Sequence, residues 1–134
     1  MLVIFRIHRL AQLTDVALRP TFAAAGLAPG DFDVLAALRR TGPPHARTAG
    51  QLREALMVTS GAVSKQAGKA LITRAVGTDD ARVRRITLTD AGVALVDELI
   101  EVHLDNERRL LAGLTAELAA ALAVLAADLE TDRA

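Results

Sequence analysis

Apolar residues recur every three or four positions along most of the chain, a spacing typical of amphipathic helices. The first such stretch predicts a helix over residues 2–25, with Leu10 and Leu13 on one face. Pro20 is expected to kink this helix or end it early, because proline lacks a backbone donor. Gly26 then marks the stop.

A second helix opens at residues 28–31, where a proline and an acidic residue both suit the first helical turn. It is expected to bury Phe32, Leu35 and Leu38, and to end before Gly42. The pattern therefore predicts a helix with one apolar face in the core.

Two short helices with a tight connection follow. Thr48 and Gln51 lie three residues apart, the arrangement in which each side chain satisfies a free backbone donor at a helix start. After a break at residues 57–58, Thr59 and Ser60 can cap a second short helix. Two short helices joined by a tight turn are typical of a helix-turn-helix.

The only β-compatible runs cover residues 71–76 and 83–88, with turn-forming residues between them. They predict a small hairpin, or wing. Thr89 then caps a long helix over residues 90–112.

Gly113 and Thr115 mark a break before a last helix that ends near residue 128. A leucine stripe follows at intervals of three and four: Leu111, Leu114, Leu118, Leu122, Leu125 and Leu129. A second copy of the chain, the first helix of the same subunit, or both could cover it. The whole pattern predicts a mainly α protein with a small β-hairpin wing.

Composition narrows the function. The 134 residues are 51% apolar, which suits one domain with a core and excludes a disordered chain. No apolar run approaches the roughly 20 residues that span a bilayer, so we expect a cytoplasmic protein with no membrane partner. Cysteine is absent, which excludes disulfides, thiolate nucleophiles and cysteine zinc sites.

The formal charge is zero, but the charged residues are unevenly distributed. Residues 60–89 hold six basic and two acidic side chains, whereas residues 90–134 hold three basic and ten acidic. This asymmetry indicates a middle segment that faces a polyanion and a C-terminal segment with another role, such as self-association. Chance clustering on solvated faces is the alternative.

The stretch from Thr48 to Lys65 reads Thr-x-x-x-Leu-x-x-x-Leu-x-Val-Thr-Ser-Gly-Ala-Val-Ser-Lys and resembles the helix-turn-helix of the MarR family. The Asp-x-Arg motif of the family's wing is matched by Asp80-Ala81-Arg82. Residues 26–35 and 86–92 extend the resemblance over nearly the whole chain, in the right order.

The resemblance implies one MarR-type domain over residues 1–134. Residues 27–89 would form the winged helix-turn-helix, and residues 1–26 and 90–134 would form dimerisation helices. One departure is plain: between Lys65 and Leu71 the family usually has about four more residues, roughly one helical turn.

The resemblance places the second short helix in the major groove of duplex DNA, which is wide enough to admit a helix. It places Arg82 in the minor groove, with Asp80 holding the wing loop. The candidate DNA-binding residues are Arg47, Thr48, Thr59, Ser60, Gly61, Ser64, Lys65, Gln66, Arg82 and Arg84, the last favoured over Arg85. Alternatively, Ser60 only caps its helix, and Lys65 and Gln66 are solvated.

His8, His45 and His103 show no metal-ligand spacing, and no nucleophile, base and oxyanion donor occur together. We therefore expect no metal, no cofactor and no enzyme activity. The main alternative is a helical protein-interaction module that has lost DNA binding. The four residues missing between Lys65 and Leu71 and the zero net charge suggest it. The basic wing argues against it.

The resulting hypothesis is a homodimeric transcription regulator that binds duplex DNA at a near-palindromic operator. The family resemblance further suggests a repressor that is released by a small aromatic or phenolic effector. No residue in the sequence identifies such a ligand.

Overall fold

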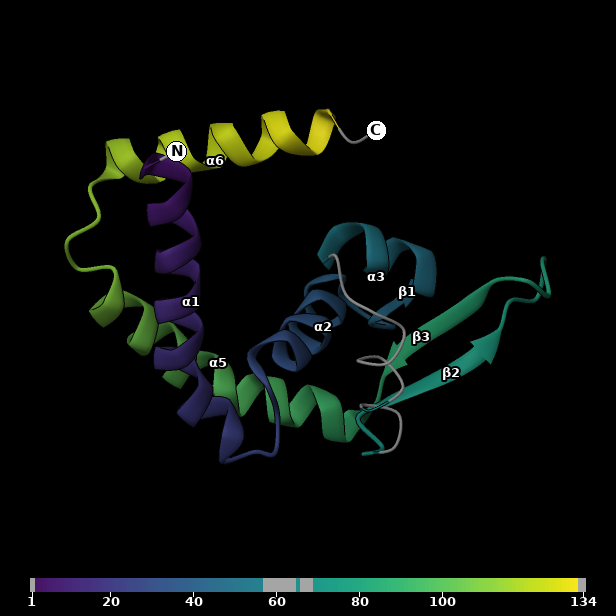
Figure 1. Cartoon of the computed structure of the whole chain (residues 1–134). Helices are drawn as coiled ribbons and strands as arrows, with labels where there is room; N and C mark the ends of the chain where they lie inside the picture. The colour runs from purple at the N-terminus through teal and green to yellow at the C-terminus, as the bar shows by residue number, and fades with distance from the viewer. Residues whose placement is uncertain (1, 57–64, 66–68, 133–134) are drawn as a thin grey trace. The chain divides into compact units, whose positions relative to one another are not determined.

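The computed structural model describes residues 2–56, 65 and 69–132. This part of the chain contains five helices and one three-stranded antiparallel sheet (Figure 1). The predicted fold class, mainly α with a small β wing, is confirmed. The chain divides into two compact units, Met1–His103 and Leu104–Ala134.

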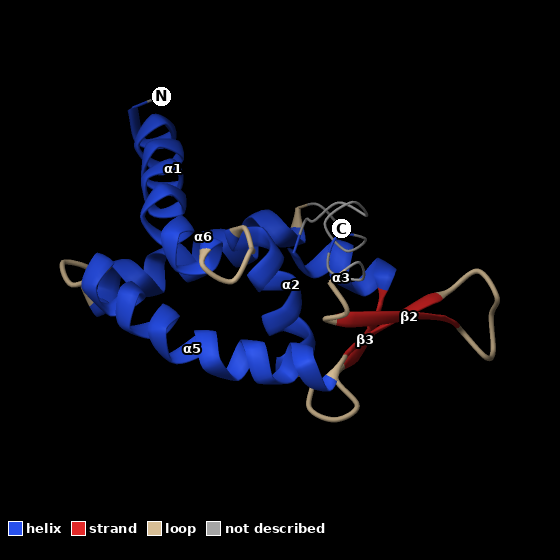
Figure 2. Cartoon of the chain, turned by 90° about the horizontal axis from the view of Figure 1, so that it is seen from below, coloured by secondary structure: helices blue, strands red, loops and turns tan. Residues whose placement is uncertain are grey.

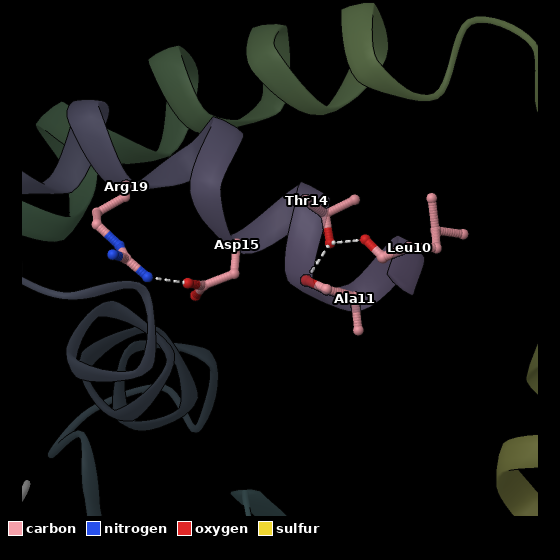
Figure 3. Close-up of polar contacts among 5 residues, drawn as sticks. All are labelled: Leu10, Ala11, Thr14, Asp15 and Arg19. Carbon is pink, nitrogen blue, oxygen red and sulfur yellow. Dashed lines mark hydrogen bonds and ion pairs between the residues drawn. The ribbon is translucent and has the colours of Figure 1, made fainter. Parts of the chain in front are cut away.

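Helix α1 spans Leu2–Ala23 and does not end at Pro20, which lies inside it. The buried ring of Phe22 lies beyond the proline and packs in the core, which helps to hold the last turn despite the missing backbone donor. Along its exposed side, Thr14 donates to the Leu10 and Ala11 carbonyls and Arg19 pairs with Asp15 (Figure 3).

The stop at Gly26 is confirmed. Gly26 has φ +70°, a conformation that glycine adopts without strain. Its N–H donates to the Ala23 carbonyl (2.9 Å), and the N–H of Leu27 donates to the Phe22 carbonyl (2.9 Å). These two bonds form a Schellman motif, which satisfies the last carbonyls of the helix.

Helix α2 spans Pro29–Arg40, and its predicted apolar face lies in the core. Phe32, Leu35 and Leu38 are buried. The Phe32 ring stacks on Phe22 at a centroid distance of 4.7 Å, and the His103 ring lies 5.2 Å from Phe32. The end of α1 is thereby joined to the core around α2.

Three strands form the sheet in the order β1-β3-β2: β1 is Ala46–Thr48, β2 is Ile72–Val76 and β3 is Arg84–Leu88. The hairpin of β2 and β3 agrees with the prediction to within one residue. Strand β1 was missed, because three residues carry no alternation. Its pairing with β3, through Arg47 opposite Ile86, defines it.

Helix α3, Ala49–Leu56, begins directly after β1. The predicted capping box is present: Thr48 Oγ1 accepts from the Gln51 N–H (3.1 Å) and Gln51 Oε1 accepts from the Thr48 N–H (2.9 Å). Leu52 is fully buried and attaches the helix to the core.

Helix α5, Asp90–Leu110, starts at the end of β3. Thr89 Oγ1 accepts from the Gly92 N–H (3.1 Å) and donates to the Ala70 carbonyl (2.8 Å), so the cap also holds the chain just before β2. Arg39 on α2 pairs with Asp97 on α5 at 2.9 Å. That hydrogen bond and charge raise the pKa of the Arg39 guanidinium.

Helix α6 spans Ala116–Thr131, three residues beyond its predicted end. Thr115 caps it by accepting from the Leu118 N–H (3.2 Å). The predicted leucine stripe on this helix is exposed along its length.

Candidate nucleic-acid interface

The hairpin of β2 and β3 projects from the helices and ends in a turn at its free tip (Figure 2). The turn is closed by hydrogen bonds from the Gly77 N–H to the Val83 carbonyl (2.8 Å) and from the Val83 N–H to the Asp80 carbonyl (3.1 Å). Asp80 Oδ1 accepts from the Arg82 N–H at 2.9 Å. The carboxylate thus fixes the backbone that carries the Arg82 side chain.

A pocket of about 670 Å³ lies between this wing and the start of α3. Four arginines line it, Arg53 from α3 and Arg74, Arg82 and Arg84 from the wing. We call it the arginine pocket. Its remaining lining residues are Thr48, Ala49, Gly50, Ala75, Val76, Val83 and Ile86.

The arginine pocket is strongly electropositive. Its lining, as far as the structure describes the chain, includes no aspartate or glutamate. Guanidinium groups stay charged at any physiological pH and bind phosphates through paired N–H donors. A concave surface of this kind suits a phosphodiester.

Thr48 and the first residues of α3 form one wall of this pocket. The first N–H groups of a helix lack intrahelical acceptors and favour anions. Because Thr48 Oγ1 accepts from the Gln51 N–H, the N-terminal end of α3 is held in a defined geometry. The structure therefore brings three of the candidate residues, Thr48, Arg82 and Arg84, to one pocket.

Arg47 lies elsewhere. It lines a separate, shallower hollow of about 470 Å³ with Thr41, Gln51 and Glu54. Thr48 lines the arginine pocket instead. The two candidates are neighbours in sequence but do not share a surface.

Lys65 has a protein partner. Its Nζ lies 3.2 Å from Asp31 Oδ2 at the start of α2. Five other candidates, Thr59, Ser60, Gly61, Ser64 and Gln66, lie outside the described residues.

Sequence reasoning missed Arg53 and Arg74. The alternation of the hairpin contained the signal for Arg74, which pairs across the sheet with Ile86 and lies two residues after the buried Ile72. Arg53 follows Ala49 by four positions on α3, so both lie on the helix face toward the wing. Only the three-dimensional structure shows that these two arginines, from α3 and from the hairpin, line the same pocket.

Among the described residues, no group of three or more histidine, cysteine or acidic side chains is placed to hold a metal ion. None of the described helices combines the length and apolarity that a bilayer crossing requires.

The amino-acid sequence matches no protein-family model. It is 37% identical over 123 residues to the HTH-type transcriptional regulator PecS of Dickeya dadantii (strain 3937), a MarR-family protein. This match covers 87% of the chain and 73% of PecS. The chain belongs to the MarR family. As a member it is a transcriptional regulator, and the family is not one of enzymes.

Solved structures of other MarR-type proteins share its fold. A mutant MarR from E. coli complexed with operator DNA superposes with a TM-score of 0.81 at 23% identity, covering 96% of this chain and 94% of that one. Sco3205, a MarR family transcriptional regulator from Streptomyces coelicolor in complex with DNA, gives 0.85 at 22% identity, with coverages of 96% and 83%. BpsR of Bordetella bronchiseptica, whose DNA binding is regulated by 6-hydroxynicotinic acid, superposes with a TM-score of 0.81 at 23% identity. This match covers 95% of this chain and 91% of BpsR.

Proposed function

We propose that this MarR-family regulator is a homodimeric repressor that binds a near-palindromic operator in the cytoplasm. The arginine pocket carries the proposal, because it joins the wing and the start of α3 into one basic surface. The DNA backbone would follow this surface between the two grooves that the protein reads. Neutralising several phosphates releases counterions and supplies much of the affinity.

Each candidate residue except Lys65 has a proposed role in DNA binding. Arg82 enters the minor groove, where the negative potential is concentrated. Arg84 and Thr48 bind the backbone at the arginine pocket, and Arg47 binds it from the neighbouring hollow. Base reading belongs to the segment after α3, with Ser60, Gly61, Ser64 and Gln66 in the major groove and Thr59 at its cap.

The dimer would form through residues 1–26 and 90–134, around the winged part at residues 27–89. Two observations support this division. The N-terminal part of α1 exposes Leu2, Val3, Ile4 and Phe5, and α6 exposes its leucine stripe. Exposed apolar surface of that extent marks an interface, and the commonest partner is a second copy.

Effector control is the last part of the proposal. BpsR is regulated by an aromatic acid, and a small aromatic or phenolic ligand would act here in the same way. Such a ligand releases DNA only if it binds better to a dimer whose recognition helices no longer match the half-sites. Candidate aromatic acids and phenols can be added to a DNA-binding assay; ligands that bind the protein without changing its DNA affinity would contradict this part.

The function is tested by selecting bound duplexes from a random library and then titrating the selected sequence with salt. The selected sequence should be a near-palindrome whose half-sites lie about one turn of the DNA helix apart. The affinity should fall steeply with salt, as phosphate contacts require. If no sequence is enriched at any salt concentration, sequence-specific DNA binding is excluded, and the protein-interaction module becomes the favoured function.

A further inference from the structure

The chain has two lysines, Lys65 and Lys69, and both lie in the stretch between α3 and β2. All other basic side chains, histidine apart, are arginines. Lys65 pairs with Asp31, and Lys69 donates to the Gly26 carbonyl. Both lysines therefore contact residues 26–31, at the connection between α1 and α2.

Asp31 is an unusual partner for a DNA-binding lysine because it is almost fully buried. Its side chain is 6% exposed, against 53% for Lys65. The same oxygen, Oδ2, accepts from the Ala28 N–H at 2.8 Å. Since a buried carboxylate stays charged only with hydrogen bonds and a nearby cation, the ammonium of Lys65 has a structural function here.

We infer that Lys65 is a positioning residue: its contact with Asp31 fixes Lys65 at the start of α2 instead of leaving the ammonium for a phosphate. This rests on the proposed function and removes Lys65 from the DNA contacts, among which the family resemblance had placed it. A lysine that neutralises a buried carboxylate adds little net charge for a phosphate.

The two possible roles of Lys65 give opposite results for Asp31→Asn. If Lys65 binds a phosphate, removing the carboxylate frees the lysine and removes a negative charge near DNA, so operator affinity should rise. If Lys65 is a positioning residue, Asp31→Asn breaks the contact and affinity should fall. The sign of the change therefore separates the roles.

The experiment compares Asp31→Asn, Lys65→Met and the double variant on the selected operator. Asp90→Asn is the matched control, because it removes the same charge from an exposed position in the first turn of α5. We expect Asp31→Asn and Lys65→Met each to weaken binding about tenfold, a change of about 1.4 kcal/mol. The double variant should be no weaker, since both changes break one contact. Asp90→Asn should stay within about twofold of wild type.

The salt dependence gives a second readout. Loss of a phosphate contact lowers the slope of log affinity against log salt by about 0.9, whereas loss of a positioning contact leaves it unchanged. We expect an unchanged slope for Lys65→Met. A reduced slope, or an affinity of Asp31→Asn equal to or above that of Asp90→Asn, overturns the inference.

Hydrogen exchange tests the contact without DNA. The backbone amides of Lys65 and Lys69 should exchange faster in Asp31→Asn than in Asp90→Asn, and thermal melting should show that both proteins are folded. Equal rates overturn the inference. If the wild type selects no duplex, the proposed function fails, and the exchange rates still decide whether Asp31 holds this stretch.

Discussion

At the wing turn, the Asp80 carboxylate fixes the backbone that carries Arg82. The arginine itself lines the arginine pocket, close to the other wing cations. Since arginine retains its charge, the contribution to DNA binding that we propose for Arg82 is electrostatic as well as geometric. In this proposal the two residues of the Asp-x-Arg motif have separate tasks: Asp80 holds the turn and Arg82 binds DNA.

Replacement of Arg82 by alanine should therefore weaken operator binding about tenfold to a hundredfold, which is typical for the loss of one specific contact. The slope of affinity against salt should fall by about one if the guanidinium also neutralises a phosphate. Fluorescence anisotropy at several salt concentrations measures both. Arg19→Ala, which removes an exposed arginine of α1, is the matched control (Figure 3); an equal loss in both variants would mean that only net charge matters.

Gly92 shows how closely α5 approaches the wing. A Cβ at this position would lie 2.7 Å from Leu88 Cδ1 and closer still to the Leu71 carbonyl oxygen. Gly92→Ala should therefore lower the free energy of unfolding by about 1–3 kcal/mol, a typical cost of overpacking. Chemical denaturation measures the change.

Gly30 provides the control, since no atom lies within 4 Å of a Cβ built there. Gly30→Ala on α2 should leave stability unchanged or raise it by up to about 1 kcal/mol, because alanine restricts the unfolded chain. If Gly92→Ala proved as stable as Gly30→Ala, the close packing of α5 on residues 71 and 88 would be incorrect.

Among the elements, α3 depends most on its cap, because it has only eight residues. Thr48→Ala removes the acceptor for the Gln51 N–H and should cost about 1 kcal/mol of stability. Thr48→Ser keeps the hydroxyl and should lose much less. Thermal unfolding compares them; a similar loss in both variants would show that the methyl group, and not the cap, matters.

The caps and stops of the helices were predictable because they are local. Thr48, Thr89 and Thr115 all accept the backbone N–H three residues later, and Gly26 ends α1. Such contacts depend on residue type at fixed spacing. The continuation of α1 through Pro20 was not predictable in this way, because buried Phe22 lies beyond the proline.

The candidate site was predictable in part for the same reason. The Asp-x-Arg motif is a local signal, whereas Arg53 and Arg74 join Arg82 only through the packing of α3 beside the sheet. Strand β1 likewise exists through its pairing with β3 and has no signal of its own. The partner of Lys65, 34 positions away on α2, could not be inferred from spacing at all.

For the whole molecule, the distribution of apolar surface points to self-association. The leucine stripe of α6 is exposed, and most of the apolar residues of α1 are also exposed. Among the described residues of α1, Phe22 is buried in the core and Leu18 packs partly against it. The chain therefore exposes apolar side chains on α1 and α6 that its own core does not bury.

Leu122→Asp should break the dimer, because it places a charge in the middle of the stripe where a second chain is expected to pack. Sedimentation should then report a monomer. Operator affinity should drop about 100-fold or more, since a monomer loses the gain from two linked half-sites. The control is Ala127→Asp, half a helical turn from the stripe on the same helix. A Leu122→Asp variant that remains dimeric would exclude the α6 stripe as the interface, and a monomer that kept full operator affinity would exclude paired reading of half-sites.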